Sequence, residues 1–213
     1  MSAEGFGGVQ ERKKVIRDQA HENRRKQEHK DELSHVICDK FVSLPEYAAA
    51  QAVMFYVDVR TEVRTRHFLE TALSHGKQIV VPWCHDSGEL ELFWLKSMDD
   101  LMIGMYKILE PKPELRLAPD RQVPVARLDL IMVPGVAFTR DGARMGHGKG
   151  YYDKLLEHAR PDAPLVALAF ECQLFPEIPT QEHDVFMDKI ITEEAVYAGR
   201  GRSDGNDGLK IAN

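Results

Sequence analysis

The sequence contains little cysteine and no cysteine pair. Its 213 residues include three cysteines, Cys38, Cys84 and Cys172, and none of them belongs to a Cys-x-x-Cys motif. This spacing does not suggest a zinc site or a dithiol redox motif. A sparse, odd number of cysteines is typical of reduced thiols in the cytosol. We therefore expect a cytoplasmic protein.

Long apolar runs and a strong charge of one sign are also missing. No segment approaches the roughly 20 apolar residues of a membrane span, and residues 1–8 contain no hydrophobic signal core. The net charge of −6 argues against bulk binding of nucleic acid. We expect neither a membrane nor a nucleic-acid partner, and the sequence does not indicate an oligomeric state.

The segment from residue 9 to about 44 is predicted to be helical and strongly charged. Residues 11–30 contain eight Lys or Arg against four acidic residues. For most of these charges, the ordinary structural interpretation is a helix that lies over the domain with its charged side chains in solvent. An RNA-binding arm is a weaker alternative, because no aromatic residues alternate with the basic ones. We expect a flexible segment 1–8, a single domain 9–198 and a flexible tail 199–213.

After Pro45, strand and helix patterns alternate. This alternation predicts an α/β fold with three layers, in which helices cover both faces of a mostly parallel, Rossmann-like sheet. Segment 108–124 is expected to be a loop with little regular structure. The predicted strands are 52–57, 78–83, 90–95, 128–133, 165–170 and 189–192, and the predicted helices after Pro45 are 62–74, 150–160 and a turn at 193–197.

The most informative segment follows the strand predicted at 128–133. It contains Gly142, Gly146, Gly148 and Gly150, with Lys149 between the last two. Glycine permits positive φ and close approach of a ligand, and amide N–H groups left free before a helix bind anions. The pattern predicts a phosphate site, although such glycines can also form a purely structural turn. The spacing fits neither the P-loop nor the dinucleotide fingerprint, which disfavours a Rossmann-type dehydrogenase.

The residues of this loop also carry a resemblance to a known family. The runs 129–138 and 142–153, the latter with Arg144, Lys149, Tyr151, Tyr152 and Asp153, resemble 5-formyltetrahydrofolate cyclo-ligase, also called methenyltetrahydrofolate synthetase. Further matching blocks occur in the expected order, at 13–17, 56–65, 106–111, 169–173 and 183–192.

The resemblance implies a reaction that depends on ATP and Mg²⁺. In it, 5-formyltetrahydrofolate is cyclised to 5,10-methenyltetrahydrofolate, and ADP and phosphate are released. The γ-phosphoryl group moves to the formyl oxygen, and N10 then attacks the formyl carbon. Such chemistry depends on positioning and on cations around the phosphoryl oxygens. A catalytically inactive folate- or nucleotide-binding protein on the same scaffold is the alternative.

The resemblance also assigns roles by matched position. Lys149 and Arg144 are implied to be catalytic, and Asp153 and Asp188 to bind Mg²⁺. The implied ATP-binding residues are Lys13, Arg17, Arg144, Met145, Gly146, His147, Gly148, Lys149, Gly150, Tyr151 and Tyr152. The implied folate-binding residues are Val57, Glu62, His147, Gly148, Lys149, Gly150 and Tyr151.

Each assignment has an ordinary structural alternative. Lys13 and Arg17 can be surface charges, Asp153 can favour a helix dipole, and Glu62 can be an acid at a helix N-terminus. Asp188 can be a turn residue, and the two tyrosines can pack on the sheet. His147 departs from the family, which often carries Arg or Tyr there, and His183 is expected to position Asp184 rather than to bind metal.

Overall fold

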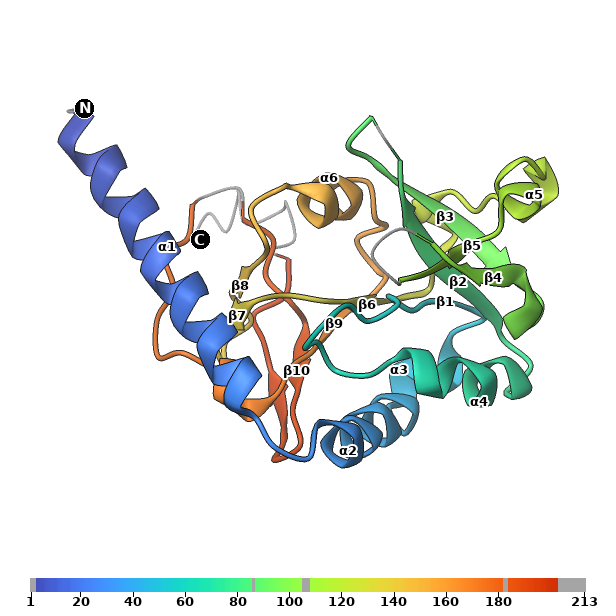
Figure 1. The fold of residues 1–213 in the computed structure, drawn as a ribbon, viewed down its shortest axis with the longest axis horizontal. Helices are drawn as coiled ribbons and strands as arrows, with labels where there is room; N and C mark the ends of the chain where they lie inside the picture. Colours follow the sequence, from blue (N-terminus) through green and yellow to red (C-terminus); the bar gives the residue numbers. More distant parts are fainter. Residues whose placement is uncertain (1–2, 86, 105–107, 182–183, 203–213) are drawn as a thin grey trace, which may run out of the picture.

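The computed structural model describes residues 3–85, 87–104, 108–181 and 184–202, with side chains from Gly8 onward (Figure 1). Two residues of the matched blocks, Tyr106 and His183, lie outside this part of the chain. The helices are α1 Ala3–Lys26, α2 Lys30–Val42, α3 Pro45–Ala49, α4 Leu69–Ser74, α5 Pro113–Arg116 and α6 Tyr151–Glu157, with 3₁₀ turns η1 Arg66–Phe68, η2 Met98–Asp100, η4 Pro119–Arg121, η5 Val125–Arg127 and η6 Glu171–Gln173. The strands are β1 Ala52–Met54, β2 Gln78–Cys84, β3 Leu90–Leu95, β4 Leu101–Ile103, β5 Leu109–Pro111, β6 Leu130–Val133, β7 Ala137–Phe138, β8 Arg144–Met145, β9 Leu165–Leu168, β10 Lys189–Ile191 and β11 Val196–Ala198.

The main sheet has seven strands in the order β11-β10-β9-β6-β1-β2-β3. The strands from β10 to β2 run parallel, while β11 and β3 pair antiparallel at the two edges. This confirms the predicted α/β fold and the hairpin between β2 and β3. Two small sheets, β4-β5 and β7-β8, stand beside the main one.

Helices cover both faces of the sheet, as predicted. Along β1 and just after it, Val53 and Phe55 belong to the core that includes Phe41 of α2 and Leu69 of α4. Met54, between them, belongs to the core that includes Leu155 of α6. Successive strand residues point to opposite faces, so this short strand contributes to both cores. Figure 1 shows α6 on one side of the sheet and α2, α3 and α4 on the other.

The helix predicted over 9–44 is interrupted. α1 ends at Lys26 and α2 begins at Lys30, and His29 between them has a positive φ of 53°. The two helices serve different cores, because Ala20 packs with β7 and β8 while Phe41 packs under the main sheet. One straight helix would not reach both. The backbone is also helical from Ala3, within the segment predicted to be flexible.

Three other local predictions are wrong. In place of the helical turn predicted at 193–197, the chain turns and enters strand β11 at Val196, because Thr192 closes a turn with Ala195 and returns the chain along β10. The helix predicted over 62–74 begins only at η1, after a turn that contains Glu62. Segment 108–124 contains β5, α5 and η4, in which Pro113 and Pro119 occupy the first helical positions that proline tolerates.

The start of the predicted flexible tail is attached to the domain. The Gly199 and Arg200 amides donate hydrogen bonds to the carbonyls of Asp188 and Asp141. Arg202 Nη1 donates to the Ala159 carbonyl at 3.2 Å. Residues 203–213 lie outside the described part.

Among the described residues, no helix combines the length and apolarity needed to cross a membrane.

Asp129 joins three segments at the amino edge of the sheet. Its Oδ2 accepts hydrogen bonds from the Gln51 and Ala52 amides at 3.0 and 2.9 Å, and Oδ1 accepts one from Arg160 at 3.2 Å. Partial burial alone would raise the pKa of Asp129, but these hydrogen bonds outweigh it and lower the pKa.

We expect Asp129→Ala to lower the free energy of unfolding by about 1–3 kcal/mol at pH 7, because two strand-entry amides lose their acceptor. The pKa of Asp129 is lower in the folded state, so its contribution is present above its ordinary value of 3.8 and lost as the pH falls through the folded value. Urea unfolding at pH 7 and pH 3 measures this. The difference from wild type should shrink at pH 3, and Asp120→Ala, at an exposed position, should have little effect. A difference that stays constant with pH would contradict the role.

Candidate active site

The candidate site lies at the carboxyl edge of the parallel strands. The segments that leave β1, β2 and β6 start from neighbouring positions there, because these strands are adjacent and parallel. Figure 1 shows the C-terminal half of α1 beside β7 and β8, while its N-terminal half projects away from the domain. Ligands of open α/β sheets bind at this edge.

The turn after β1 is fixed by a buried aspartate. Asp58 is 1% exposed, and its Oδ2 accepts two hydrogen bonds from Arg66, at 3.0 and 2.8 Å. Thr65 donates its hydroxyl proton to the Tyr56 carbonyl and accepts the Asp58 amide at 3.2 Å. These contacts close the turn that carries Glu62.

Glu62 is held within this turn, with 7% of its surface exposed. Its Oε2 accepts the Val59 amide at 2.9 Å, and Oε1 lies 3.3 Å from His147 Nε2. The second contact joins the turn after β1 to the glycine loop, 85 residues along the chain. The structure therefore brings together two residues that the resemblance assigns to folate.

The glycine loop, defined here as residues 146–150, connects β8 to α6. Gly148 and Gly150 have φ values of +89° and +72°. None of the amides of residues 147–150 donates a hydrogen bond to another described residue. His147, Gly148 and Lys149 are exposed. Free amides and an exposed lysine at this bend form an arrangement suited to phosphate oxygens.

One face of α1 borders the loop and the Glu62 turn. Arg17 Nε donates to the Gly146 carbonyl at 3.1 Å. His21, four residues later, stacks on His147 with ring centroids 5.5 Å apart. Arg24, a further turn along, donates to Thr61 Oγ1 at 3.1 Å and to the Gly135 carbonyl at 3.2 Å. Lys13 lies one helical turn before Arg17 and is partly exposed.

The two stacked histidines have unequal surroundings. Burial lowers the pKa of His21, and the charges of Arg24 and His147 lower it further, while Asp18 acts in the opposite direction. His147 keeps 51% of its side chain exposed. His21 therefore favours its neutral form, which suits a ring placed beside Arg24.

The aromatic residues of the site differ in burial. Burial raises the pKa of Tyr152 well above its usual range, and the charges of Glu62 and Cys84 add to this effect. Tyr152 packs against the cores on both faces, so it is partly structural. Val57 is 9% exposed and belongs to the core below the sheet, while Tyr151 is partly exposed at the start of α6.

Arg144 is buried and makes two protein contacts. Its Nη1 donates to the Pro134 carbonyl at 3.3 Å, and Nη2 forms an ion pair with Asp153. Burial lowers the pKa of Arg144, which Asp153 partly offsets. Only 5% of the Arg144 side chain is exposed, whereas 65% of Asp153 is. Arg144 thus fixes the base of the loop.

The structure does not bring the two predicted Mg²⁺ ligands together. Asp188 precedes β10 and aligns with Leu165 at the amino edge, where its Oδ2 accepts the Leu165 amide at 2.7 Å. Asp153 stands in the first turn of α6, which follows the loop at the carboxyl edge. The resemblance assigned both aspartates to Mg²⁺ from their positions in the sequence. Those positions do not show in which direction each strand runs, and strand direction places the two aspartates at opposite edges of the sheet. No group of three His, Cys, Asp or Glu suited to a metal occurs in the described residues.

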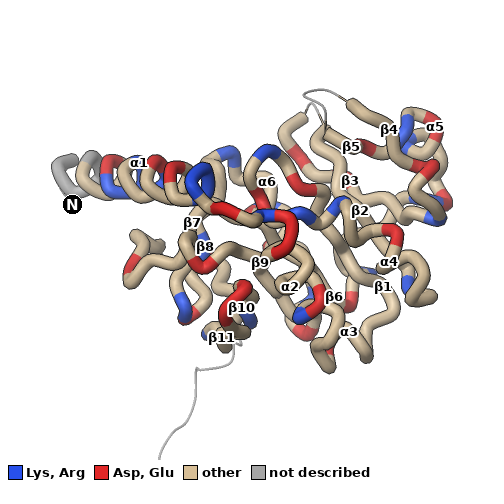
Figure 2. The backbone as a smooth tube through the Cα atoms, turned by 60° about the horizontal axis from the view of Figure 1, so that its bottom comes forward, with Lys and Arg blue, Asp and Glu red and all other residues tan. Residues whose placement is uncertain are grey.

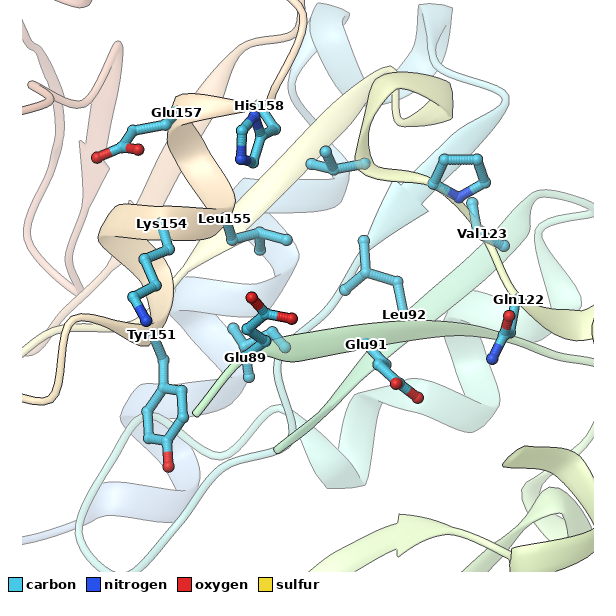
Figure 3. Close-up of a pocket in the computed structure, with 13 residues that line it drawn as sticks. Glu89, Glu91, Leu92, Gln122, Val123, Tyr151, Lys154, Leu155, Glu157 and His158 are labelled. Carbon is cyan, nitrogen blue, oxygen red and sulfur yellow. The ribbon is translucent and has the colours of Figure 1, made fainter. Parts of the chain in front are cut away.

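A cavity of about 620 Å³ lies between α6 and β3 (Figure 3). Of the predicted site residues it includes Tyr151, and Glu89, Glu91 and Glu157 contribute negative charge to its walls. Figure 3 shows α6 on one side of it, and β3 with Gln122 and Val123 on the other. The three carboxylates outnumber the one lysine of the lining, Lys154, and so disfavour an anionic ligand, which leaves the glycine loop as the better phosphate candidate.

Several residues at the site were not predicted from the sequence. Arg24 and His21 share the helical spacing 17, 21, 24, which places them on the same face of α1 as Arg17. Cys84 ends β2, and burial raises the pKa of its thiol, as does Glu110, while Lys149 lowers it. Nothing local in the sequence indicates that Cys84 approaches the loop.

Comparison with known proteins gives a consistent result. Residues 9–193 match the model of the 5-formyltetrahydrofolate cyclo-ligase family. A probable 5-formyltetrahydrofolate cyclo-ligase of Schizosaccharomyces pombe is 34% identical, over 78% of this chain and 86% of that protein. The Escherichia coli K12 5-formyltetrahydrofolate cyclo-ligase is 27% identical, over 80% and 93%.

Solved structures show the same relationship. The 5,10-methenyltetrahydrofolate synthetase of Aquifex aeolicus superposes with a TM-score of 0.76 at 29% identity, over 93% of this chain and 98% of that one. The synthetase of Mycoplasma pneumoniae shares the fold, with a TM-score of 0.67 at 22% identity, over 85% and 99% of the two chains.

We expect two glycines of this region to respond differently to alanine. Gly142 has a φ of +98°, and a Cβ there would collide with the Met187 carbonyl, whereas a Cβ on Gly148 would lie 3.6 Å from Arg17. Gly142→Ala should therefore lower the free energy of unfolding by about 2 kcal/mol or more, and Gly148→Ala by about 1 kcal/mol, from backbone strain. Chemical denaturation measures both, with Gly8→Ala, in open space on α1, as the control. Equal losses at positions 142 and 148 would contradict this difference.

Proposed function

The chain belongs to the 5-formyltetrahydrofolate cyclo-ligase family, and we propose that it converts 5-formyltetrahydrofolate to 5,10-methenyltetrahydrofolate while ATP is converted to ADP and phosphate. The observation that carries the proposal is the contact between Glu62 and His147, which joins a buried carboxylate to the glycine loop. One side of this junction offers a carboxylate to ring N–H donors. The other offers amides and Lys149 to phosphate oxygens. A folate and a nucleotide thereby meet at one place.

The proposed reaction requires two bond exchanges at the formyl group. The formyl oxygen attacks the γ-phosphorus as the bond to the β-phosphate oxygen breaks, and ADP leaves. N10 then attacks the formyl carbon and loses its proton, and the carbon–oxygen bond breaks as phosphate leaves. Most of the work is positioning and stabilisation of charge.

The residues of the chain fit these tasks as follows. Lys149 is exposed within the loop and supplies a cation for the transferred phosphoryl group. The amides of residues 147–150 and Arg17 surround the triphosphate, and Lys13 extends this positive face by one turn. Glu62 binds the pterin through its N–H donors, and Tyr151 borders the same space. Arg144 holds the loop in shape through Pro134 and Asp153.

In the described part of the chain, Asp153 and Asp188 do not lie together as a two-aspartate Mg²⁺ site. Asp153 is exposed beside the loop, but it already pairs with Arg144, and Asp188 stands at the opposite edge. Mg²⁺ commonly binds through substrate phosphates, water and one or two carboxylates. In our proposal the ion enters with the nucleotide phosphates, and no step depends on a metal held by protein side chains.

In the first test, the purified protein is mixed with 5-formyltetrahydrofolate and MgATP, and the near-ultraviolet absorbance of the methenyl product is followed. We expect product formation that requires ATP and stops with EDTA. Lys149→Ala should lower kcat by about 100-fold or more, because a cation at the transferred group is lost. Lys154→Ala, an exposed lysine of α6, is the matched control and should retain activity.

Two outcomes would contradict the proposal in different ways. Full activity of Lys149→Ala would remove the role assigned to that lysine. Binding of 5-formyltetrahydrofolate by calorimetry, without product from the wild-type protein, would favour a binding protein on the same scaffold.

A further inference from the structure

Arg24 is a buried cation that none of the site assignments includes. Its residue surface is 2% exposed, although it belongs to the charged helix α1. Arg25, its neighbour, keeps 66% of its side chain exposed and pairs with Glu22 on the same helix. Figure 2 shows Lys/Arg and Asp/Glu positions interspersed along α1, as on a solvated helix. Arg24 is the exception to that description.

Arg24 contacts the Glu62 turn and the segment that follows β6, both of which border the candidate site. Its Nε donates to the hydroxyl of Thr61, the residue immediately before Glu62. Its Nη1 donates to the carbonyl of Gly135, two residues beyond the end of β6, and Gln173 Nε2 donates to the same carbonyl at 3.2 Å. One guanidinium therefore connects the Glu62 turn, the start of the segment that leads to the glycine loop, and α1.

The electrostatic surroundings of Arg24 point to Glu62. Burial lowers the pKa of Arg24, and Glu62 is the first of the groups that oppose this effect, followed by Tyr56 and Cys172. Glu62 is itself buried, and no Lys or Arg side chain forms an ion pair with it among the described residues; its one side-chain partner there is the exposed His147. A buried carboxylate needs nearby positive charge and hydrogen-bond donors. Arg24 supplies the charge without occupying the oxygen atoms of Glu62.

We propose that Arg24 is a positioning residue for the folate pocket, which holds the Glu62 turn against the glycine-loop segment and supplies the counter-charge to Glu62. The inference rests on the proposed folate role of Glu62. Because Arg24 bonds to Thr61 and Gly135 rather than to Glu62, both carboxylate oxygens remain directed toward Val59 and His147. Substrate N–H donors can then replace His147 at Oε1 while Arg24 stays in place.

The test compares Arg24→Gln with Arg25→Gln, its neighbour on the same helix. Arg24→Gln should raise the Kd and KM for 5-formyltetrahydrofolate by about tenfold or more, while the KM for ATP changes by less than about threefold. Arg24→Lys, which keeps the charge, should recover part of the loss, and it replaces the glutamine variant if that variant does not fold. Arg25→Gln should behave as wild type. Equal effects on folate and ATP, or no effect on folate, would overturn the proposal.

A double-mutant cycle separates positioning from general stability. If Arg24 acts through Glu62, adding Arg24→Gln to Glu62→Gln should cost little more folate affinity than Glu62→Gln alone. Additive losses would overturn the proposal.

Hydrogen exchange gives a readout that does not depend on turnover. The Val59 amide, which donates to Glu62, should exchange faster in Arg24→Gln than in Arg25→Gln. Unchanged exchange at Val59 would overturn the inference. Failure of the wild-type protein to form product, with this difference intact, would count against the proposed reaction alone.

Discussion

The parallel alignment of β1, β6 and β9 is the constraint on which the site depends. Because the strands run in one direction, the Glu62 turn after β1 and the segment after β6 leave the sheet at the same edge. Residues 85 positions apart can then touch, as Glu62 and His147 do. The same direction places Asp129 and Asp188, which precede strands, at the other edge, where Asp129 accepts two backbone amides and Asp188 accepts one.

Buried charged side chains support this arrangement through specific contacts. Asp58 with Arg66 closes the turn after β1, Arg144 with Asp153 fixes the base of the glycine loop, and Arg24 joins the two regions. Removing one member of such a pair leaves an uncompensated charge, which costs more than the pair itself contributes. The exposed groups, Lys149 and the amides around it, are left for ligands. In the proposed function, the buried charges thus shape the site, and the exposed ones bind the ligands.

Sequence patterns predicted the strands well where an apolar run was bounded by turn residues such as glycine. β2 and β3 and the turn between them follow from apolar runs interrupted by Gly88. The turn that holds Glu62 was mistaken for a helix, because its geometry depends on Asp58 and Thr65, whose side chains replace helical hydrogen bonds. Strand β11 was mistaken for a helical turn, because only pairing with β10 stabilises so short a segment. Intrinsic helix or strand propensity predicts secondary structure poorly wherever tertiary contacts supply the hydrogen bonds.

The sequence by itself determined the α/β fold, the glycine loop with its lysine and the family, because these depend on residue type and order along the chain. The tertiary structure alone decided which polar residues lie close together in space. It joined Glu62 to His147, turned His21 and Arg24 of a charged helix inward, and separated Asp153 from Asp188. Such proximity depends on strand direction and on how α1 packs. Neither is encoded in the local spacing of residues.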